Sequence, residues 1–271
     1  MHPIPVRRMK FEVPDAAVFD PIYIAGDASA SYQLTGLGLY VAQLEPFIVK
    51  SMRRVLERVT DPALKEEAER FCRQEAQHYQ QHERFNAVVL AQDYPGLAER
   101  VQVLHEDFDR YLAGKSDKFR IGFLEGFEAN TTQGALFLLA SGLLDHRDTE
   151  PHFGQLFKWH MLEEIEHRNV AFDIYQHLYG DYLYRARMCW VAQHHMAKFI
   201  DDCTAIMMKV DVARHGERCH ITLRGRLERL LSRMVPRVRS MLPGYTPHAY
   251  RVPRRVARLS VEFTTLAESA S

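Results

Sequence analysis

The chain has 271 residues, 46% of them hydrophobic, and its 35 basic and 35 acidic residues give a formal net charge of zero. This composition allows a full apolar core in one large domain, or in one domain with an appendage. Residues 1–14 carry Arg7, Arg8 and Lys10 with no apolar stretch after them, so no secretory signal or transit peptide is expected. The longest apolar run, Gly134–Leu144, is too short to span a bilayer. We therefore expect a cytoplasmic protein.

The cysteines give no sign of a metal-binding or disulfide framework. The four cysteines, Cys72, Cys189, Cys203 and Cys219, form no C-x-x-C pair. This spacing argues against a zinc ribbon, an iron–sulfur site or a set of disulfides, and favours buried thiols in a reducing compartment.

Turn and helix-cap signals divide the first 180 residues into four long helices and one crossover. Asp61-Pro62 is typical of a helix start, because Asp is a good N-cap and Pro suits the first helical turn. Short links join the first helix to the second and the third to the fourth, whereas the link between the second and third is long. The expected helices cover about 31–59, 62–90, 117–144 and 151–179, with a helical crossover over 97–112. This pattern predicts an all-α fold, a ferritin-like four-helix bundle with one long crossover and additional C-terminal helices.

The sequence beyond residue 180 predicts further helices. Residues 181–210 form the expected fifth helix, and residues 220–241 are expected to be helical up to Pro236. Residues 243–253 are expected to form a loop, and residues 264–271 a frayed end. The predicted organisation is an N-terminal arm (1–30), a metal-binding bundle with the fifth helix (31–211) and an Arg-rich helical extension (212–271).

The C-terminal extension is strongly basic. Between residues 212 and 258, twelve Arg face only Glu217 and Glu228, a balance of +10. Leu, Val and Met interleave these arginines at helical spacing, which favours a basic face that docks against the acidic bundle or a partner subunit. Binding of nucleic acid or anionic lipid is the alternative, and it predicts a steep dependence on salt.

Two Glu-x-x-His motifs carry the candidate chemistry. Glu75–His78 and Glu164–His167 each place a carboxylate and an imidazole one turn apart on one helix face, where both can reach the same metal. The motif alone has little specificity. A third copy, Glu217–His220, has no preceding partner carboxylate and is interpreted as a coincidence.

Each of the first two motifs is preceded by a carboxylate in an apolar helix, Glu45 and Glu128. The order Glu, Glu-x-x-His, Glu, Glu-x-x-His is that of dinuclear carboxylate proteins. Counted from the expected hairpin turns at about 1.5 Å per residue, each hairpin brings its ligands to the same level within roughly one turn. Unpaired carboxylates among apolar neighbours are costly unless a cation compensates them, so a metal site is favoured over solvent-facing charges. Mixed oxygen and nitrogen ligands suit two iron ions, with manganese or zinc as alternatives.

The residues also carry a family resemblance. The sequence resembles the bacterial ferritin-like family of predicted metal-dependent hydrolases through Leu44–Phe47, Phe127–Thr132 and, most specifically, Trp159–Asp173. The ligand pattern of that family is similar to that of di-iron carboxylate oxygenases, and the resemblance implies a metal-dependent enzyme. One departure is Ala129-Asn130, where the family tends to have His and an aromatic residue; it is expected to reshape the substrate pocket.

A further histidine and three nearby groups complete the candidate site. His160 lies on the same face as Glu164 and His167, in an arrangement that resembles the fourth ligand helix of di-iron arylamine N-oxygenases, so it is predicted to be a seventh ligand; a core role is the alternative. Glu163 is expected to accept a hydrogen bond from a ligand imidazole. The remaining expected supporting residues, with a surface position as the alternative, are His82 and Glu125.

These residues predict a dinuclear metalloenzyme that uses dioxygen to oxidise an apolar or aromatic small molecule, with an external electron donor. The alternative is a hydrolase of esters or phosphoesters at the same two metals. An iron-storage cage fits the large C-terminal extension poorly, and nucleic acid is not an expected partner. A homodimer is left open.

Overall fold

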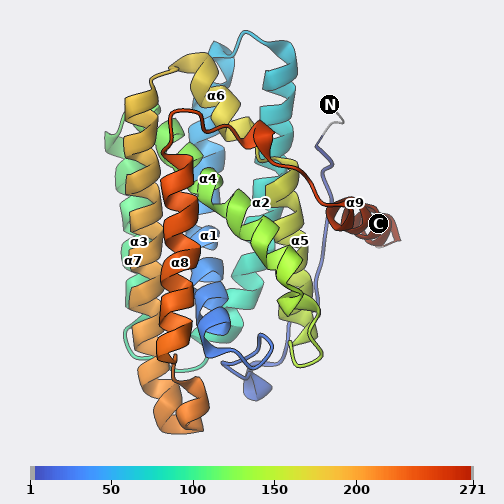
Figure 1. The fold of residues 1–271 in the computed structure, drawn as a ribbon, viewed down its shortest axis with the longest axis vertical. Helices are drawn as coiled ribbons and strands as arrows, with labels where there is room; N and C mark the ends of the chain where they lie inside the picture. The colour runs from blue at the N-terminus through green and yellow to red at the C-terminus, as the bar shows by residue number, and fades with distance from the viewer. Residues whose placement is uncertain (1–3, 270–271) are drawn as a thin grey trace.

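The computed structural model describes residues 4–269, and Figure 1 shows an all-helical molecule in which these residues form no strand. The all-α fold class is confirmed. The helices are α1 (Ala28–Val55), α2 (Pro62–Leu90), α3 (Leu97–Gly114), α4 (Asp117–Ser141), α5 (Pro151–Glu166), α6 (Val170–Leu178), α7 (Tyr182–His215), α8 (Leu223–Ser240) and α9 (Arg254–Ser269).

The helices pack as a bundle whose connections follow the predicted order. α1 packs along α2, and α4 packs along α5 and α6. In the sequence, α3 connects α2 to α4. It runs along the side of the bundle and is the crossover that the sequence predicts (Figure 1). α7 packs against both α1 and α4. The helices of the two predicted hairpins therefore enclose one shared interior.

Side-chain caps fix where the main helices begin. The Asp61 carboxylate accepts hydrogen bonds from the N–H groups of Ala63 and Leu64, at 2.9 and 3.3 Å, and Pro62 occupies the first helical position. Asp27 and Ser116 cap α1 and α4 in the same way. Such caps satisfy N–H groups that have no partner inside the helix.

The predicted fourth helix is wrong in one respect, because it is not continuous to residue 179. It divides into α5 and α6 at residues 167–169. His167 ends α5 with φ −95° and ψ 5°, and its N–H still donates to the Glu163 carbonyl at 3.0 Å. The break therefore falls at the last of the predicted ligands.

Two predictions for the C-terminal region are also wrong. α8 continues through Pro236 to Ser240, because Arg237 and Ser240 are buried and hydrogen-bond to Gln193 of α7. Residues 264–269 belong to α9, which packs on α5 with Phe263 fully buried, instead of fraying. Residues 270–271, the end of the stretch expected to fray, lie outside the described residues.

α4 and α7 approach so closely that a glycine is required between them. A Cβ atom added at Gly126 would lie 2.7 Å from the Cys189 Cα and from the Met188 carbonyl oxygen, both backbone atoms of α7. Gly134, two turns further along α4, faces open space. The register between these helices therefore depends on position 126.

We predict that Gly126→Ala destabilises the protein by about 1–3 kcal/mol, because the backbone of α7 must move away from α4. Gly134→Ala is the matched control in the same helix, and it should stabilise by about 0.5–1 kcal/mol through its higher helix propensity. Urea unfolding of both variants measures the two free energies. Equal effects of the two substitutions would contradict the close approach.

Candidate metal centre

The seven predicted ligands meet in the interior of the bundle. They come from α1, α2, α4 and α5, with His167 directly after the last residue of α5, and each is at most 2% exposed; they are Glu45, Glu75, His78, Glu128, His160, Glu164 and His167. Among residues 4–269, two groups of three have ligand atoms that all lie within 4.8 Å of one another. The first is Glu45, His78 and His160, and the second is Glu75, Glu164 and His167.

The first group centres on Glu45. Its Oε1 lies 3.9 Å from His78 Nδ1 and 3.8 Å from His160 Nε2. His160 Nε2 also lies 2.9 Å from Oε1 of Glu164, which belongs to the second group. His78 Nδ1 lies 3.8 Å from Glu75 Oε2. Glu75 and Glu164, which belong to the second group, thus also contact histidines of the first.

The second group centres on His167. Its Nε2 lies 3.5 Å from Glu75 Oε1, 3.4 Å from Glu128 Oε2 and 3.6 Å from Glu164 Oε2. Ligand atoms that each lie about 2.1 Å from one ion are about 3 Å or slightly more apart. The observed separations therefore fit donors arranged around a cation, and Glu128 completes the second group.

The polar atoms left without partners provide a test of whether metals fit these residues. Both carboxylate oxygens of Glu45 and of Glu128 are buried and accept no hydrogen bond within the described part of the chain. The same holds for further atoms that face the groups, which are Glu75 Oε1, His78 Nδ1, Glu164 Oε2 and His167 Nε2. Buried polar atoms are otherwise almost always satisfied. Orphaned oxygen and nitrogen atoms from four helices, all turned to one place, fit two metal ions.

Hydrogen bonds on the outer side orient two of the imidazoles. His78 Nε2 donates to Glu163 Oε2 at 3.1 Å, because a carboxylate can only accept, and this leaves the Nδ1 lone pair facing the cluster. His167 Nδ1 lies 3.0 Å from Gln74 Oε1, and the Gln74 amide nitrogen donates to the Pro5 carbonyl at 2.8 Å. Since that carbonyl can only accept, the amide is fixed with its oxygen toward His167. His167 therefore presents the Nε2 lone pair to the cluster.

In the metal-free site, four of the seven candidate ligands have raised pKa values. Burial raises the pKa of Glu45 well above its usual range and that of Glu128 to about 8, and repulsion from neighbouring carboxylates adds to both shifts. The surrounding carboxylates outweigh burial at His78 and His167 and raise the pKa of both imidazoles. The site therefore holds protons where a divalent cation would replace them.

Glu163, which the sequence predicts as a support, is held from three sides. Besides His78, its carboxylate accepts from Trp159 Nε1 and from Arg7 Nη1, both at 2.9 Å. The Arg7 guanidinium is itself buried and also pairs with Glu166, at 2.7 Å. This network fixes the orientation of a candidate ligand from outside the cluster.

Arg7 and Gln74 support the candidate site and were not predicted from the sequence. Arg7 lies in the N-terminal arm, and its other partners, Ser260 and Thr264, lie on α9. The N-terminal arm at Arg7 and α9 therefore both contact the outer side of the site. No local motif marks Arg7; Gln74 was identifiable only by its place one turn before His78.

The two other predicted supports have different surroundings. His82 Nε2 lies 2.6 Å from His160 Nδ1, and burial lowers the pKa of both rings. His160 Nε2 donates to Glu164 Oε1 at 2.9 Å, and a metal ion would replace the proton between these two atoms. Glu125 points elsewhere. Its carboxylate contacts Arg185 and Cys189 of α7, at 3.0 and 3.3 Å, and stabilises the α4–α7 contact instead of a ligand.

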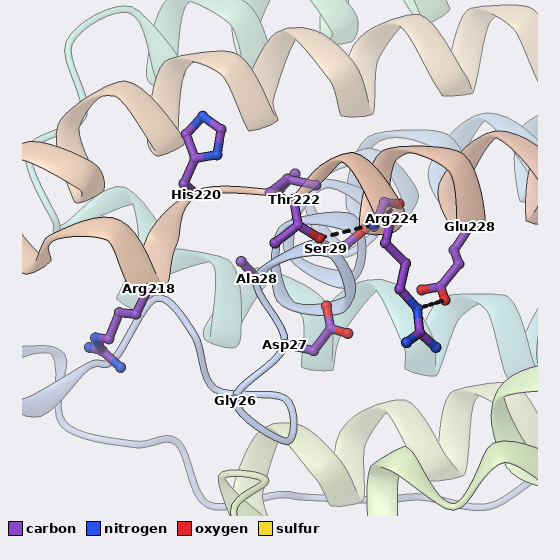
Figure 2. Close-up of a pocket in the computed structure, with 11 residues that line it drawn as sticks. Gly26, Asp27, Ala28, Ser29, Arg218, His220, Thr222, Arg224 and Glu228 are labelled. Atoms are coloured by element: carbon purple, nitrogen blue, oxygen red, sulfur yellow. Dashed lines mark hydrogen bonds and ion pairs between the residues drawn. The ribbon is translucent and has the colours of Figure 1, made fainter.

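A cavity of about 130 Å³ adjoins the cluster at the break between α5 and α6. His167 lines it together with Arg168 and Asn169, and the buried Asn169 Oδ1 has no hydrogen-bond partner among residues 4–269. A second cavity, of about 300 Å³, lies where the N-termini of α1 and α8 meet (Figure 2). It contains His220 of the third Glu-x-x-His copy, and none of the seven candidate ligands lines it. Of these two cavities, only the first is lined by a candidate ligand.

An all-α bundle with two adjoining groups of buried carboxylates and imidazoles belongs to the class of candidate dinuclear metalloproteins. The family model of predicted metal-dependent hydrolases matches residues 5–250, and the chain belongs to this family. No curated protein and no solved structure matches the chain. No helix of residues 4–269 is long and apolar enough to cross a membrane.

We predict that Glu163→Gln weakens metal binding by about 10–100-fold, because an amide has a single acceptor oxygen and its NH2 group must then face either His78 or the Trp159 and Arg7 donors. The variant keeps the volume of the side chain, so its fold should persist. Glu69→Gln, on the exposed side of α2, is the control and should bind metal as the wild type does. Competition with a chromophoric chelator measures both affinities. Unchanged affinity of the Glu163 variant would contradict the assigned orienting role.

We also predict that Glu128→Gln stabilises the metal-free protein increasingly as the pH rises from about 5 to 8. The folded-state pKa of about 8 lies above the unfolded value of 4.5, so the wild type loses stability as the pH rises through this window. An amide carries no charge, and the gain at pH 8 should be on the order of 1–3 kcal/mol. Urea unfolding in the presence of a chelator measures it. A gain that is independent of pH would contradict the assignment.

Proposed function

We propose that the protein is a dinuclear metalloenzyme that binds two iron ions and uses dioxygen to oxidise an apolar or aromatic small molecule. The observation that supports this most directly is the set of orphaned carboxylate oxygens and imidazole nitrogens in the bundle interior. Four carboxylates and three imidazoles suit iron or manganese, whereas a structural zinc site favours sulfur ligands in a closed tetrahedron. Manganese or zinc in the same ligands is the alternative.

Each ion has a distinct set of ligands in this proposal. Glu45, His78 and His160 hold one, and His167 and Glu128 hold the other, while Glu75 and Glu164 contact both groups. Two bound ferrous ions would supply the redox chemistry, each giving one electron toward the reduction of dioxygen. Further turnover then requires an external electron donor.

The protein residues supply orientation, exclusion of water and access. Trp159 and Phe71 contact the ligand rings of His78 and His167 edge-on, with ring centroids 4.8 Å apart in each pair. These rings keep water from the outer sides of the two histidines, so the donors act in a medium of low dielectric constant. The cavity at Asn169 is the proposed route for dioxygen, since it borders His167.

Hydrolysis is the second candidate function, and the description of the family favours it. The same residues would hold two metals that lower the pKa of a bound water and polarise an ester or phosphoester. One of the carboxylates would then have to accept the proton of that water. The two candidates differ in whether dioxygen is consumed.

We predict that anaerobic addition of ferrous iron loads two ions per chain, and that oxygen then reacts faster than with free iron. His167→Ala should lose at least one ion and most of this reaction, because it removes the nitrogen donor of the second group. His105→Ala, on the exposed side of α3, is the control and should behave as the wild type. Metal analysis and an oxygen electrode provide the measurements.

The same preparations separate the two candidates. Two ions per chain without oxygen consumption above free iron would contradict the oxidase while leaving the metal site in place. Turnover of a p-nitrophenyl ester by the zinc or manganese protein, lost in His167→Ala, would then support the hydrolase. Failure to bind any divalent ion would contradict both functions.

A further inference from the structure

α8 is amphipathic in the opposite sense to an ordinary surface helix. The face that packs against the molecule carries Arg229, Arg233 and Arg237, whereas its leucines and valines point outward. A surface helix normally turns its apolar stripe to the core and its charges to water. Figure 1 shows α8 on the surface of the molecule beside α7, so its outer face is free to meet another surface.

The inward arginines are engaged by α7. Arg229 donates to Thr204 Oγ1 at 2.8 Å, and Arg233 pairs with Asp201 at 2.8 Å. Arg237 donates to the Gln193 carbonyl at 3.2 Å, and its guanidinium lies 5.0 Å from the centre of the Trp190 ring. These contacts fix the orientation of α8. The exposed apolar face is therefore a built feature of the fold.

The outer face forms one continuous apolar row along the helix. Its members are between 38% and 85% exposed: Leu223, Leu227, Leu230, Leu231, Met234, Val235 and Val238, followed by Leu242 just past the helix end. Together these residues expose on the order of 800 Å², which is the area that one partner buries in a standard protein interface. Apolar patches on monomers rarely exceed about 300–600 Å².

The spacing of the row matches a second copy of itself. Every member has an apolar counterpart at the same distance from the midpoint between residues 232 and 233: 223 with 242, 227 with 238, 230 with 235 and 231 with 234. Two such helices related by a two-fold axis perpendicular to them run antiparallel, and each apolar residue then meets an apolar residue at its own level. We propose that α8 forms the interface of a homodimer by pairing antiparallel with α8 of a second copy.

Charges on the rim of the row agree with this pairing. In the antiparallel arrangement, Glu228 lies within two residues of the level of Arg239 of the partner subunit, on the same flank of the row. The pairing thus places opposite charges side by side twice, once at each end. Within one copy, Glu228 accepts from Arg224 at 2.7 Å (Figure 2).

An anionic membrane fits this face less well. Helices that bind such membranes offer their Lys and Arg to lipid head groups. Here three arginines are bound to α7, Arg224 is paired with Glu228, and that glutamate would lie against anionic lipid. The proposal does not depend on the metal chemistry, because none of the candidate ligands lies on α8.

Sedimentation velocity of the full chain tests the proposal. We expect a dimer at micromolar concentration, and we expect Leu227→Glu/Leu231→Glu to raise its dissociation constant at least ten-fold. Both leucines are more than half exposed in one copy, so the variant should keep the unfolding midpoint of the wild type. The matched control, Val103→Glu/Val261→Glu, places two charges on exposed apolar positions of α3 and α9 and should remain dimeric.

A cysteine cross-link tests the antiparallel register in the same protein. All four native cysteines are buried, so Leu231→Cys, which lies near the two-fold axis, should give a maleimide-linked dimer where Val103→Cys does not. A wild type that stays monomeric at 100 µM would overturn the proposal. So would a dimer that survives the glutamates on α8. Monomers that bind phosphatidylserine vesicles through the same leucines would assign the face to a membrane instead.

Discussion

Four carboxylates buried within a few ångströms of one another repel in an interior that water cannot reach. Burial disfavours the charged form of each carboxylate, and the pKa of Glu128 in the metal-free protein rises to about 8. A fold can keep such groups only if cations or protons neutralise them. The metal-free site takes up protons on Glu45, Glu128 and two imidazoles. Two divalent ions would neutralise the same charge and also satisfy the lone pairs that protons leave unused.

The rest of the chain holds this charge in place from outside. Arg7 joins the N-terminal arm to Glu163 and Glu166 on α5, and Ser260 on α9 completes the contact. Elements that are far apart in the sequence therefore orient one histidine. The break after α5 has a related consequence, because it places His167 beside a cavity while Gln74 still fixes its ring. The side chains of α5 are thus held firmly on the outer side of the site, while a cavity adjoins the site where α5 ends.

The helical bundle and all seven candidate ligands could be predicted from the sequence, because carboxylates in apolar helices and i, i+3 pairs are local signals. It does not predict the break at residues 167–169, where no Gly or Pro interrupts the helical pattern. Arg7 and the course of α9 depend on contacts across about 250 residues, which no local pattern contains. Glu125 shares a face with Glu128 in the sequence, but Arg185 on α7 determines where its carboxylate points. Local periodicity does not predict contacts between elements that are far apart in the sequence.

α8 shows how a pattern can be identified correctly while its orientation stays hidden. Arginines interleaved with leucines at helical spacing predict an amphipathic helix whichever face is inward. The structure selects the orientation through Asp201 and Gln193, polar groups of α7 that leucines could not satisfy. Burying the arginine stems there gains apolar contact and keeps each guanidinium hydrogen-bonded to α7. The leucines then face outward, where a second α8 can cover them. Their positions are symmetric about one point of the sequence, so each apolar residue meets an apolar residue when a two-fold axis pairs the two helices.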